Sequence, residues 1–133
     1  MSVEAELESV ARALVAPGKG ILAADESGGT IGRRFEQIGL ACTEETRRAY
    51  REMLFTTPGI GSNISGTILF DETIRQKGSD GRPFPEILRR EGVIPGIKVD
   101  KGVQPLAGSP DEKETEGLDG LRARLAEYKK LGA

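Results

Sequence analysis

The sequence predicts an α/β fold with a parallel sheet, on the strength of three observations. Short apolar segments alternate along the chain with segments of helical periodicity, which is the pattern of right-handed βαβ units. The first apolar segment lacks the polar alternation of a half-exposed strand. The 18 glycines and 7 prolines lie between the periodic segments and not in one run, so they indicate turns and not disorder.

The first helix and the first strand are predicted over residues 3–15 and 21–24. Leucine and valine recur at helical spacing in the first segment, and a turn containing proline and glycine ends it. The second segment, Ile-Leu-Ala-Ala, fits a strand that is buried on both faces. A turn over residues 25–30 then opens a helix that ends at Gly39.

A further helix and a second strand are predicted in the middle of the chain. Thr43 precedes two glutamates, which together indicate a helix start with a capping hydroxyl and acids in the first turn. We expect Tyr50, Met53 and Leu54 to form the apolar face of this helix. A Thr-Pro-Gly turn closes it, and the second strand follows at about 65–70.

The C-terminal part is predicted to contain two helices, one strand and a long loop. A short helix over 86–90 and a strand over 96–99 precede a loop over 102–117. The last helix spans about 118–131 and has a glycine cap at Gly132. Its expected apolar stripe consists of Leu118, Leu121, Leu125 and Tyr128.

Three strands are few for a parallel sheet, which needs neighbouring strands and cover on both faces. A (β/α)8 barrel takes roughly 250 residues, so these 133 residues would form about its first half, with three βα units. The chain also ends directly after the predicted cap, where a fourth strand is expected. We therefore interpret residues 1–133 as the truncated N-terminal portion of a single barrel domain, without a second domain.

Composition excludes several classes of function. The net charge is −2 and no Lys/Arg block is present, so nothing indicates a nucleic-acid partner. No apolar run approaches the ~20 residues of a membrane span, and the acidic start is unlike a signal peptide. A single cysteine, Cys42, excludes an internal disulfide, and the absence of histidine excludes imidazole chemistry. A cytoplasmic location is the default expectation.

Three charged residues lie at the ends of predicted strands. Asp25 follows the first strand at its carboxyl end, where barrels and open α/β sheets place their sites; the alternative is a carboxylate that caps a turn. Lys98 and Asp100 share one face of the third strand. If that face lines a barrel, the two charges are either a site or a structural ion pair. On a half-exposed strand, they are simply solvated.

The Ser-Gly-Gly-Thr turn that ends at Thr30 is a candidate phosphate-binding turn. Glycines let an anion approach the backbone, and a helix start presents unpaired N–H groups to it. Thr30 would add a hydroxyl, with Arg34 one helical turn further along. An ordinary turn is the alternative. Arg47 and Arg48 follow an acidic helix start, and solvated surface charge is their ordinary interpretation. Cys42 has no histidine partner and is interpreted as an ordinary thiol.

Several stretches resemble class I fructose-bisphosphate aldolases and occur in the order in which that family has them. The most specific are Ala-Ala-Asp-Glu-Ser and Gly-Ile-Lys-Val-Asp-Lys-Gly. The matching stretches are residues 16–27, 66–70, 80–85, 96–102, 105–108, 117–121 and 128–130. The resemblance implies a (β/α)8 TIM barrel, usually a homotetramer. Its reaction is the reversible cleavage of fructose 1,6-bisphosphate to glycerone phosphate and glyceraldehyde 3-phosphate, through a lysine Schiff base and without metal or other cofactor.

The resemblance also assigns roles to residues. Asp25 corresponds to the active-site aspartate, which hydrogen-bonds the substrate and assists cleavage, and Lys98 to a lysine that contacts the substrate. Thr30 stands where many members have serine in the phosphate-binding turn. Arg34 and Arg48 align with arginines near the substrate phosphate.

The family's Schiff-base lysine and acid/base glutamate come from later strands, so the isolated chain is expected to be inactive. A short non-catalytic interaction protein that pairs with full-length subunits is the alternative. A coding sequence that continues past Ala133 would favour the enzyme, and a stop codon there would favour the alternative.

Overall fold

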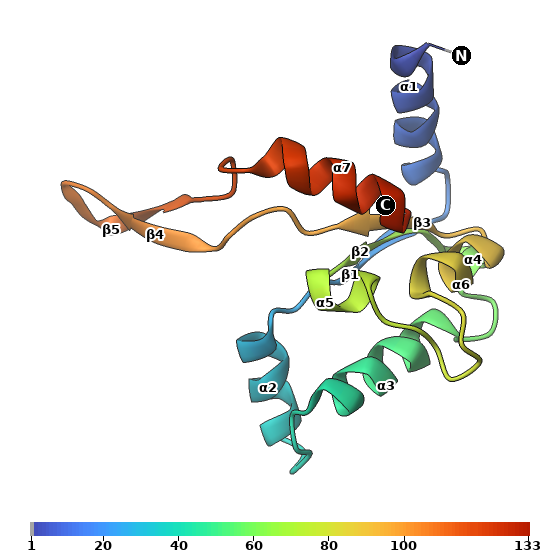
Figure 1. Ribbon diagram of the computed structural model, residues 1–133, viewed down its shortest axis with the longest axis horizontal. Coiled ribbons are helices and arrows are strands. Elements are labelled where there is room, and N and C mark those ends of the chain that lie inside the picture. Colours follow the sequence, from blue (N-terminus) through green and yellow to red (C-terminus); the bar gives the residue numbers. More distant parts are fainter. Residues whose placement is uncertain (1) are drawn as a thin grey trace.

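The computed structural model describes residues 2–133 and confirms the predicted α/β class (Figure 1). Its helices are α1 (Val3–Leu14), α2 (Gly28–Glu36), α3 (Glu44–Phe55), α4 (Ile60–Asn63), α5 (Asp71–Ile74), α6 (Phe84–Arg90) and α7 (Leu121–Leu131). Its strands are β1 (Gly20–Ala24), β2 (Ile64–Leu69), β3 (Ile94–Ile97), β4 (Val103–Leu106) and β5 (Ser109–Thr115). The short helices α4 and α5 were not predicted.

The first three strands form a parallel sheet in the order β1-β2-β3, as predicted. In the register, Ala24 lies opposite Leu69, and Leu69 lies opposite Ile97. The three strands therefore end at one common edge of the sheet. The residues that follow each strand are brought close together there, although they are far apart in the sequence.

The main core lies between the sheet and the helices α3, α4, α5 and α6 (Figure 1). Phe55 of α3 and Phe84 of α6 are fully buried and meet edge to face, with ring centroids 5.2 Å apart. Burying each such side chain contributes about 1.5–3 kcal/mol. The buried cluster consists of Ala24, Phe55, Ile60, Leu69, Ile74, Phe84, Ile87, Leu88, Val93 and Tyr128.

The prediction that β1 is buried on both faces is wrong. Only Ala24 is buried in this strand, and Ile21 is 49% exposed. The reason is position, since β1 is at an edge of the sheet and pairs only with β2 among the described strands. Small apolar residues can form an edge strand as readily as a central one.

The predicted start of α3 is confirmed, and its predicted apolar face is confirmed in part, because Leu54 packs against the core and Tyr50 packs against Phe35. Thr43 and Thr46 form a reciprocal capping box. The residues that α3 buries are Arg51 and Phe55, whereas Met53 is 58% exposed. The helix therefore presents a guanidinium to the interior, which a search for apolar periodicity does not detect.

The region predicted as a loop over 102–117 is instead an antiparallel hairpin of β4 and β5, with Val103 opposite Thr115. Its residues are nearly all polar or exposed, so no buried face marks the two strands in the sequence. The hairpin projects from the sheet (Figure 1). Strand β3 also ends at Ile97, so Lys98 follows the strand, although its N–H still donates to the Leu69 carbonyl at 2.9 Å.

The last helix starts later than predicted. Gly120, at φ 67°, precedes the first residue of α7, so Leu118 lies outside the helix and is 86% exposed. Leu125 is half-exposed, and Tyr128 is the buried residue of the stripe. The cap at Gly132 is confirmed by its left-handed conformation at φ 107°.

Candidate active site at the carboxyl edge of the sheet

Three charged side chains meet where β1 and β3 end. The Lys98 ammonium lies 2.7 Å from an Asp100 carboxylate oxygen and 3.5 Å from an Asp25 carboxylate oxygen. Each of the three side chains is about one quarter to one third exposed. The predicted residues Asp25 and Lys98 are thus brought together across 73 positions of sequence.

The two carboxylates hold Lys98 in its charged form. The hydrogen bond to Asp100 raises the pKa of Lys98, and the charge of Asp25 acts in the same direction against the cost of burial. The hydrogen bond from Lys98 and the backbone N–H of Gly102 lower the pKa of Asp100. A lysine that forms a Schiff base must first be neutral. The arrangement therefore suits Lys98 as a donor to a substrate and not as the nucleophile.

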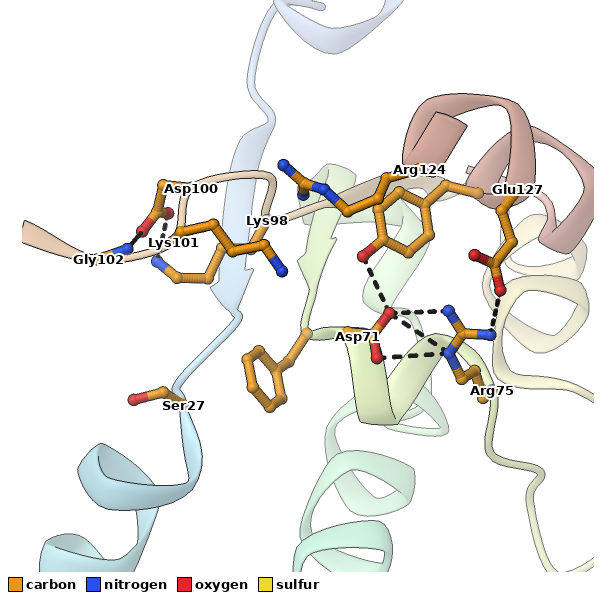
Figure 2. A pocket seen from close by; sticks show the side chains of 11 residues that line it. Ser27, Asp71, Arg75, Lys98, Asp100, Lys101, Gly102, Arg124 and Glu127 are labelled. Carbon is orange, nitrogen blue, oxygen red and sulfur yellow. Dashed lines mark hydrogen bonds and ion pairs between the residues drawn. The ribbon is translucent and has the colours of Figure 1, made fainter. Parts of the chain in front are cut away.

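A cavity of about 660 Å³ opens beside this cluster (Figure 2). Lys98, Asp100 and Lys101 come from the segment after β3, and Ser27 comes from the start of α2. Asp25 contacts Lys98 but is not on the cavity wall. The cavity has the size of a small-molecule site and carries charges of both signs.

The opposite wall is a polar network that sequence reasoning missed (Figure 2). Asp71 accepts hydrogen bonds from the Tyr128 hydroxyl at 2.9 Å and from Arg75 at 2.9 Å. Arg75 also contacts Glu127 at 2.6 Å. The bonds from Arg75 and Tyr128 lower the pKa of Asp71 against the cost of burial. The available signal was position, because Asp71 is the second residue after β2 and Asp25 is the first residue after β1.

The predicted phosphate-binding turn has room for an anion. Ser27 is the N-cap of α2 but makes no capping hydrogen bond, and its hydroxyl lies 3.3 Å from that of Thr30. Side-chain atoms added at Gly28 or Gly29 would meet nothing within 4 Å. Ser27 is also on the cavity wall, so the turn and the charged cluster border the same space.

The two predicted arginines lie in different places. Arg34, on α2, is 59% exposed at its side chain and pairs with the Glu26 carboxylate. Arg48, on α3, is bound at 2.6 Å by both Glu45 and Glu52 and is not on the cavity wall. Arg48, Glu45 and Glu52 therefore form an ion-pair network within α3, and this network explains the charge at Arg48 without a ligand.

Residues 2–133 contain no group of three or more His, Cys, Asp and Glu side chains that could hold a metal ion. Within this range, no helix has both the length and the apolar character required to cross a membrane.

Comparisons with known proteins agree with the resemblance. A family model described as "Glycolytic: Fructose-bisphosphate aldolase class-I" matches residues 6–133. A probable class 1 fructose-bisphosphate aldolase of Xanthomonas campestris is 64% identical over 133 residues, which is 100% of this chain and 40% of that protein. Fructose-bisphosphate aldolase of Drosophila melanogaster is 62% identical over 128 residues, 96% of this chain and 36% of that protein.

A solved structure extends the agreement to the fold. Fructose-bisphosphate aldolase of Plasmodium falciparum, in a complex with TRAP and a small-molecule inhibitor, matches with a TM-score of 0.95 and 50% identity. The match covers 100% of this chain and 39% of the solved one. The chain thus spans about 40% of the length of the relatives that it matches, and its three-stranded sheet agrees with the N-terminal part of a TIM barrel. On these findings, the chain belongs to the class I fructose-bisphosphate aldolase family.

Proposed function

We propose that this chain supplies the first βα units of an enzyme that reversibly cleaves fructose 1,6-bisphosphate to glycerone phosphate and glyceraldehyde 3-phosphate. The observation that carries the proposal is the cluster of Asp25, Lys98 and Asp100 at the carboxyl edge of the sheet, beside the open turn at Ser27. Charged groups of both signs at this edge suit a polar, doubly phosphorylated sugar. The Schiff-base lysine would come from outside these 133 residues.

Different groups would act on the two sides of the carbon–carbon bond that breaks in the sugar. A Schiff base to the sugar's carbonyl carbon provides an iminium that accepts the electron pair of the broken carbon–carbon bond. Asp25 would accept a hydrogen bond from a substrate hydroxyl and assist cleavage. Lys98, held as an ammonium by Asp100, would donate to the oxygens of the substrate.

Phosphate binding would use the start of α2. Thr30 would donate its hydroxyl, together with the unpaired N–H groups of the first helical turn. Arg34 would turn from Glu26 toward a phosphate, which its exposure permits. Arg48 would need to leave Glu45 and Glu52 before it could bind a phosphate, so we assign it the weakest role of the three.

We further propose that the complete protein is a single barrel domain, a homotetramer and a cytoplasmic enzyme without nucleic-acid or membrane partners and without a cofactor. Family membership supports the barrel, and the resemblance to the family implies the tetramer. The single cysteine is compatible with a reducing compartment and supports the location.

The test is a completed aldolase, in which this segment replaces the matching 133 residues of the Xanthomonas campestris relative. Triose phosphate release from fructose 1,6-bisphosphate is measured in a coupled assay. We expect activity, a kcat about 100-fold lower or worse for Asp25→Asn, and a raised KM for Lys98→Ala. A folded chimera that does not cleave the bisphosphate would overturn the proposal.

The isolated chain provides a complementary measurement. We expect no cleavage, and no adduct trapped by borohydride with glycerone phosphate, because the charged Lys98 is a poor nucleophile. A stoichiometric reduced adduct on Lys98 or Lys101 would reverse the roles assigned above.

A further inference from the structure

Arg51 is a buried cation that has no part in the site as described so far. It comes from the middle of α3, and its side chain is 1% exposed. Burying a guanidinium is costly unless its N–H groups are hydrogen-bonded and its charge is balanced. The contacts of Arg51 therefore indicate why the chain keeps a charge at this position.

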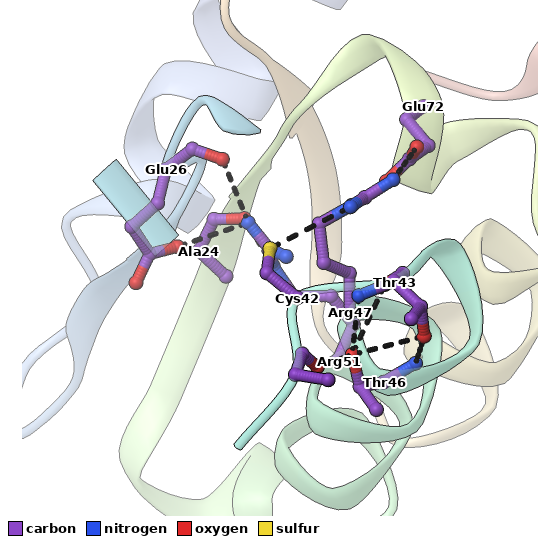
Figure 3. Close-up of polar contacts among 9 residues, drawn as sticks. Ala24, Glu26, Cys42, Thr43, Thr46, Arg47, Arg51 and Glu72 are labelled. Carbon is purple, nitrogen blue, oxygen red and sulfur yellow. Dashed lines mark hydrogen bonds and ion pairs between the residues drawn. The ribbon is translucent and has the colours of Figure 1, made fainter. Parts of the chain in front are cut away.

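Figure 3 shows the Arg51 side chain hydrogen-bonded to Ala24 and Glu26, the two neighbours of the candidate catalytic aspartate in the sequence. Arg51 Nε donates to the carbonyl of Ala24 at 3.0 Å, and Nη2 donates to the carbonyl of Glu26 at 3.0 Å. These carbonyls belong to the residues directly before and after Asp25. One rigid, planar group thus holds the backbone on both sides of that carboxylate.

Glu26 completes the arrangement. One of its carboxylate oxygens lies 3.1 Å from Arg51 Nη2, and the other pairs with Arg34. The Glu26 side chain is only 8% exposed, so its charge balances that of Arg51 away from bulk water. Arg51 thus ties α3 to the turn that follows β1.

We propose that Arg51 is a positioning residue for Asp25, held in its orientation by the Glu26 carboxylate. The proposal rests on the function proposed above. A carboxylate that assists bond cleavage must be held within a fraction of an ångström, and a displacement of about 1 Å caused by a remote change can cost about 100-fold in rate. The fork of Arg51 supplies that restraint through the backbone, without contact with the substrate.

The principal variant is Arg51→Lys in the completed aldolase. Lysine keeps the positive charge for Glu26 but has a single ammonium, which cannot reproduce the fork that reaches two carbonyls. We expect kcat to fall about 100-fold, with KM changed by less than about 3-fold, because Arg51 does not touch the substrate. A kcat equal to that of the parent enzyme would overturn the proposal.

Arg47→Lys is the matched control. Arg47 lies one helical turn earlier on α3 and makes a two-point ion pair with Glu72, at 2.7 and 2.8 Å. The other side-chain partner of Arg47 is Cys42, so its side-chain hydrogen bonds do not involve the turn at Asp25. The control removes a similar guanidinium pair from the same helix. We expect a lower midpoint of thermal unfolding but a kcat within about 2-fold of the parent, since no group beside the reacting atoms moves. A loss of kcat equal to that of Arg51→Lys would reduce Arg51 to a structural role.

A double-mutant comparison separates positioning from general damage. If Arg51 acts through Asp25, adding Arg51→Lys to Asp25→Asn should lower kcat by less than about 3-fold further. The same loss in both backgrounds would contradict the proposal. Should Arg51→Lys fail to fold, Glu26→Gln tests the same unit with a nearly isosteric change: a kcat reduced about 10-fold supports it, and an unchanged kcat overturns it. An inactive but folded parent chimera would instead overturn the proposed function, and this inference with it.

Discussion

The two faces of the parallel sheet are covered to different degrees. On one face, α3 and α6 bury aromatic and aliphatic side chains, and Phe55, Phe84 and Leu69 are inaccessible to solvent. On the other face, a hollow of about 260 Å³ lies between α1 and the strands, lined by Leu14, Ile21 and other apolar residues. Helix α1 buries none of its own residues. The same strands therefore have one face in a packed core and one largely uncovered.

The difference shows which residues determine the stability of these elements. Helix cover decides burial more than strand composition does, because Leu69 is fully buried and Ile21 is half-exposed although both are apolar strand residues. Substitutions on the covered face should accordingly be costly, and similar substitutions on the open face should have little effect.

The largest expected effect is that of Phe55→Ala, which removes a fully buried ring from the covered face. We expect the free energy of unfolding to fall by about 3–5 kcal/mol, which includes the cost of the cavity left behind. Urea denaturation followed by circular dichroism measures it. Met53→Ala on the same helix, where Met53 is 58% exposed, should cost less than about 0.5 kcal/mol. Similar losses for both variants would contradict the assigned face of α3.

A smaller effect concerns the ion pair between α3 and α5. The hydrogen bonds from Arg47 lower the pKa of Glu72 more than burial raises it. Because the folded-state pKa is depressed, the pair stabilises the protein above the unfolded pKa of about 4.3, and this contribution is lost as the pH falls through the lower folded value.

We expect Glu72→Gln to cost about 1.5–3 kcal/mol at pH 7, and the difference from the parent to shrink below about pH 4. Urea midpoints measured from pH 3 to pH 7 test the sign. A difference that grows as the pH falls would show that Glu72 is not the group responsible.

The fold was predictable where apolar periodicity reports local structure. The three parallel strands and the start of α3 follow from short-range patterns, and Asp25 and Lys98 follow from their places near strand ends. The hairpin of β4 and β5 was not predictable in this way. Its pairing is between backbone groups of polar, exposed residues, which leave no periodic signal in the sequence.

Arg51 and Asp71 show the second limit of sequence reasoning. The Arg51 side chain can be buried because its N–H groups donate to backbone carbonyls that are 25 or more positions away in the sequence. No local sequence pattern encodes such distant partners. Asp71 lies after β2 at the start of a short helix that was not predicted. Its hydrogen bond with Tyr128 was therefore not foreseen, and the sequence placed Tyr128 only in the apolar stripe of the last helix.

The N-terminal cap of α3 is expected to contribute less than the ion pair. Thr46 donates its backbone N–H to the Thr43 hydroxyl at 3.1 Å, and the Thr46 hydroxyl accepts from the Thr43 backbone at 2.9 Å. Thr43→Ala should lower the stability by about 1 kcal/mol. Ser27→Ala is the comparison, because the Ser27 side chain makes no capping hydrogen bond to the backbone of α2, and we expect this change to cost only about 0.3 kcal/mol. Equal losses in chemical denaturation would show that the box does not stabilise the covering helix.

The smallest expected effect lies on the open face, and it tests the comparison most directly. Ile21→Thr keeps a β-branched side chain suited to a strand but replaces an apolar group beside the hollow with a hydroxyl. Since Ile21 is 49% exposed, the hydroxyl can remain hydrated, and we expect a change within about 0.5 kcal/mol. Leu69→Thr, on the covered face, buries an extra hydroxyl and leaves a void, so we expect it to lower the stability by about 2–5 kcal/mol. Urea denaturation of both variants tests this comparison. A loss of stability for Ile21→Thr as large as that for Leu69→Thr would mean that the open face is covered in solution. Sedimentation velocity would then show whether a second copy of the chain covers it.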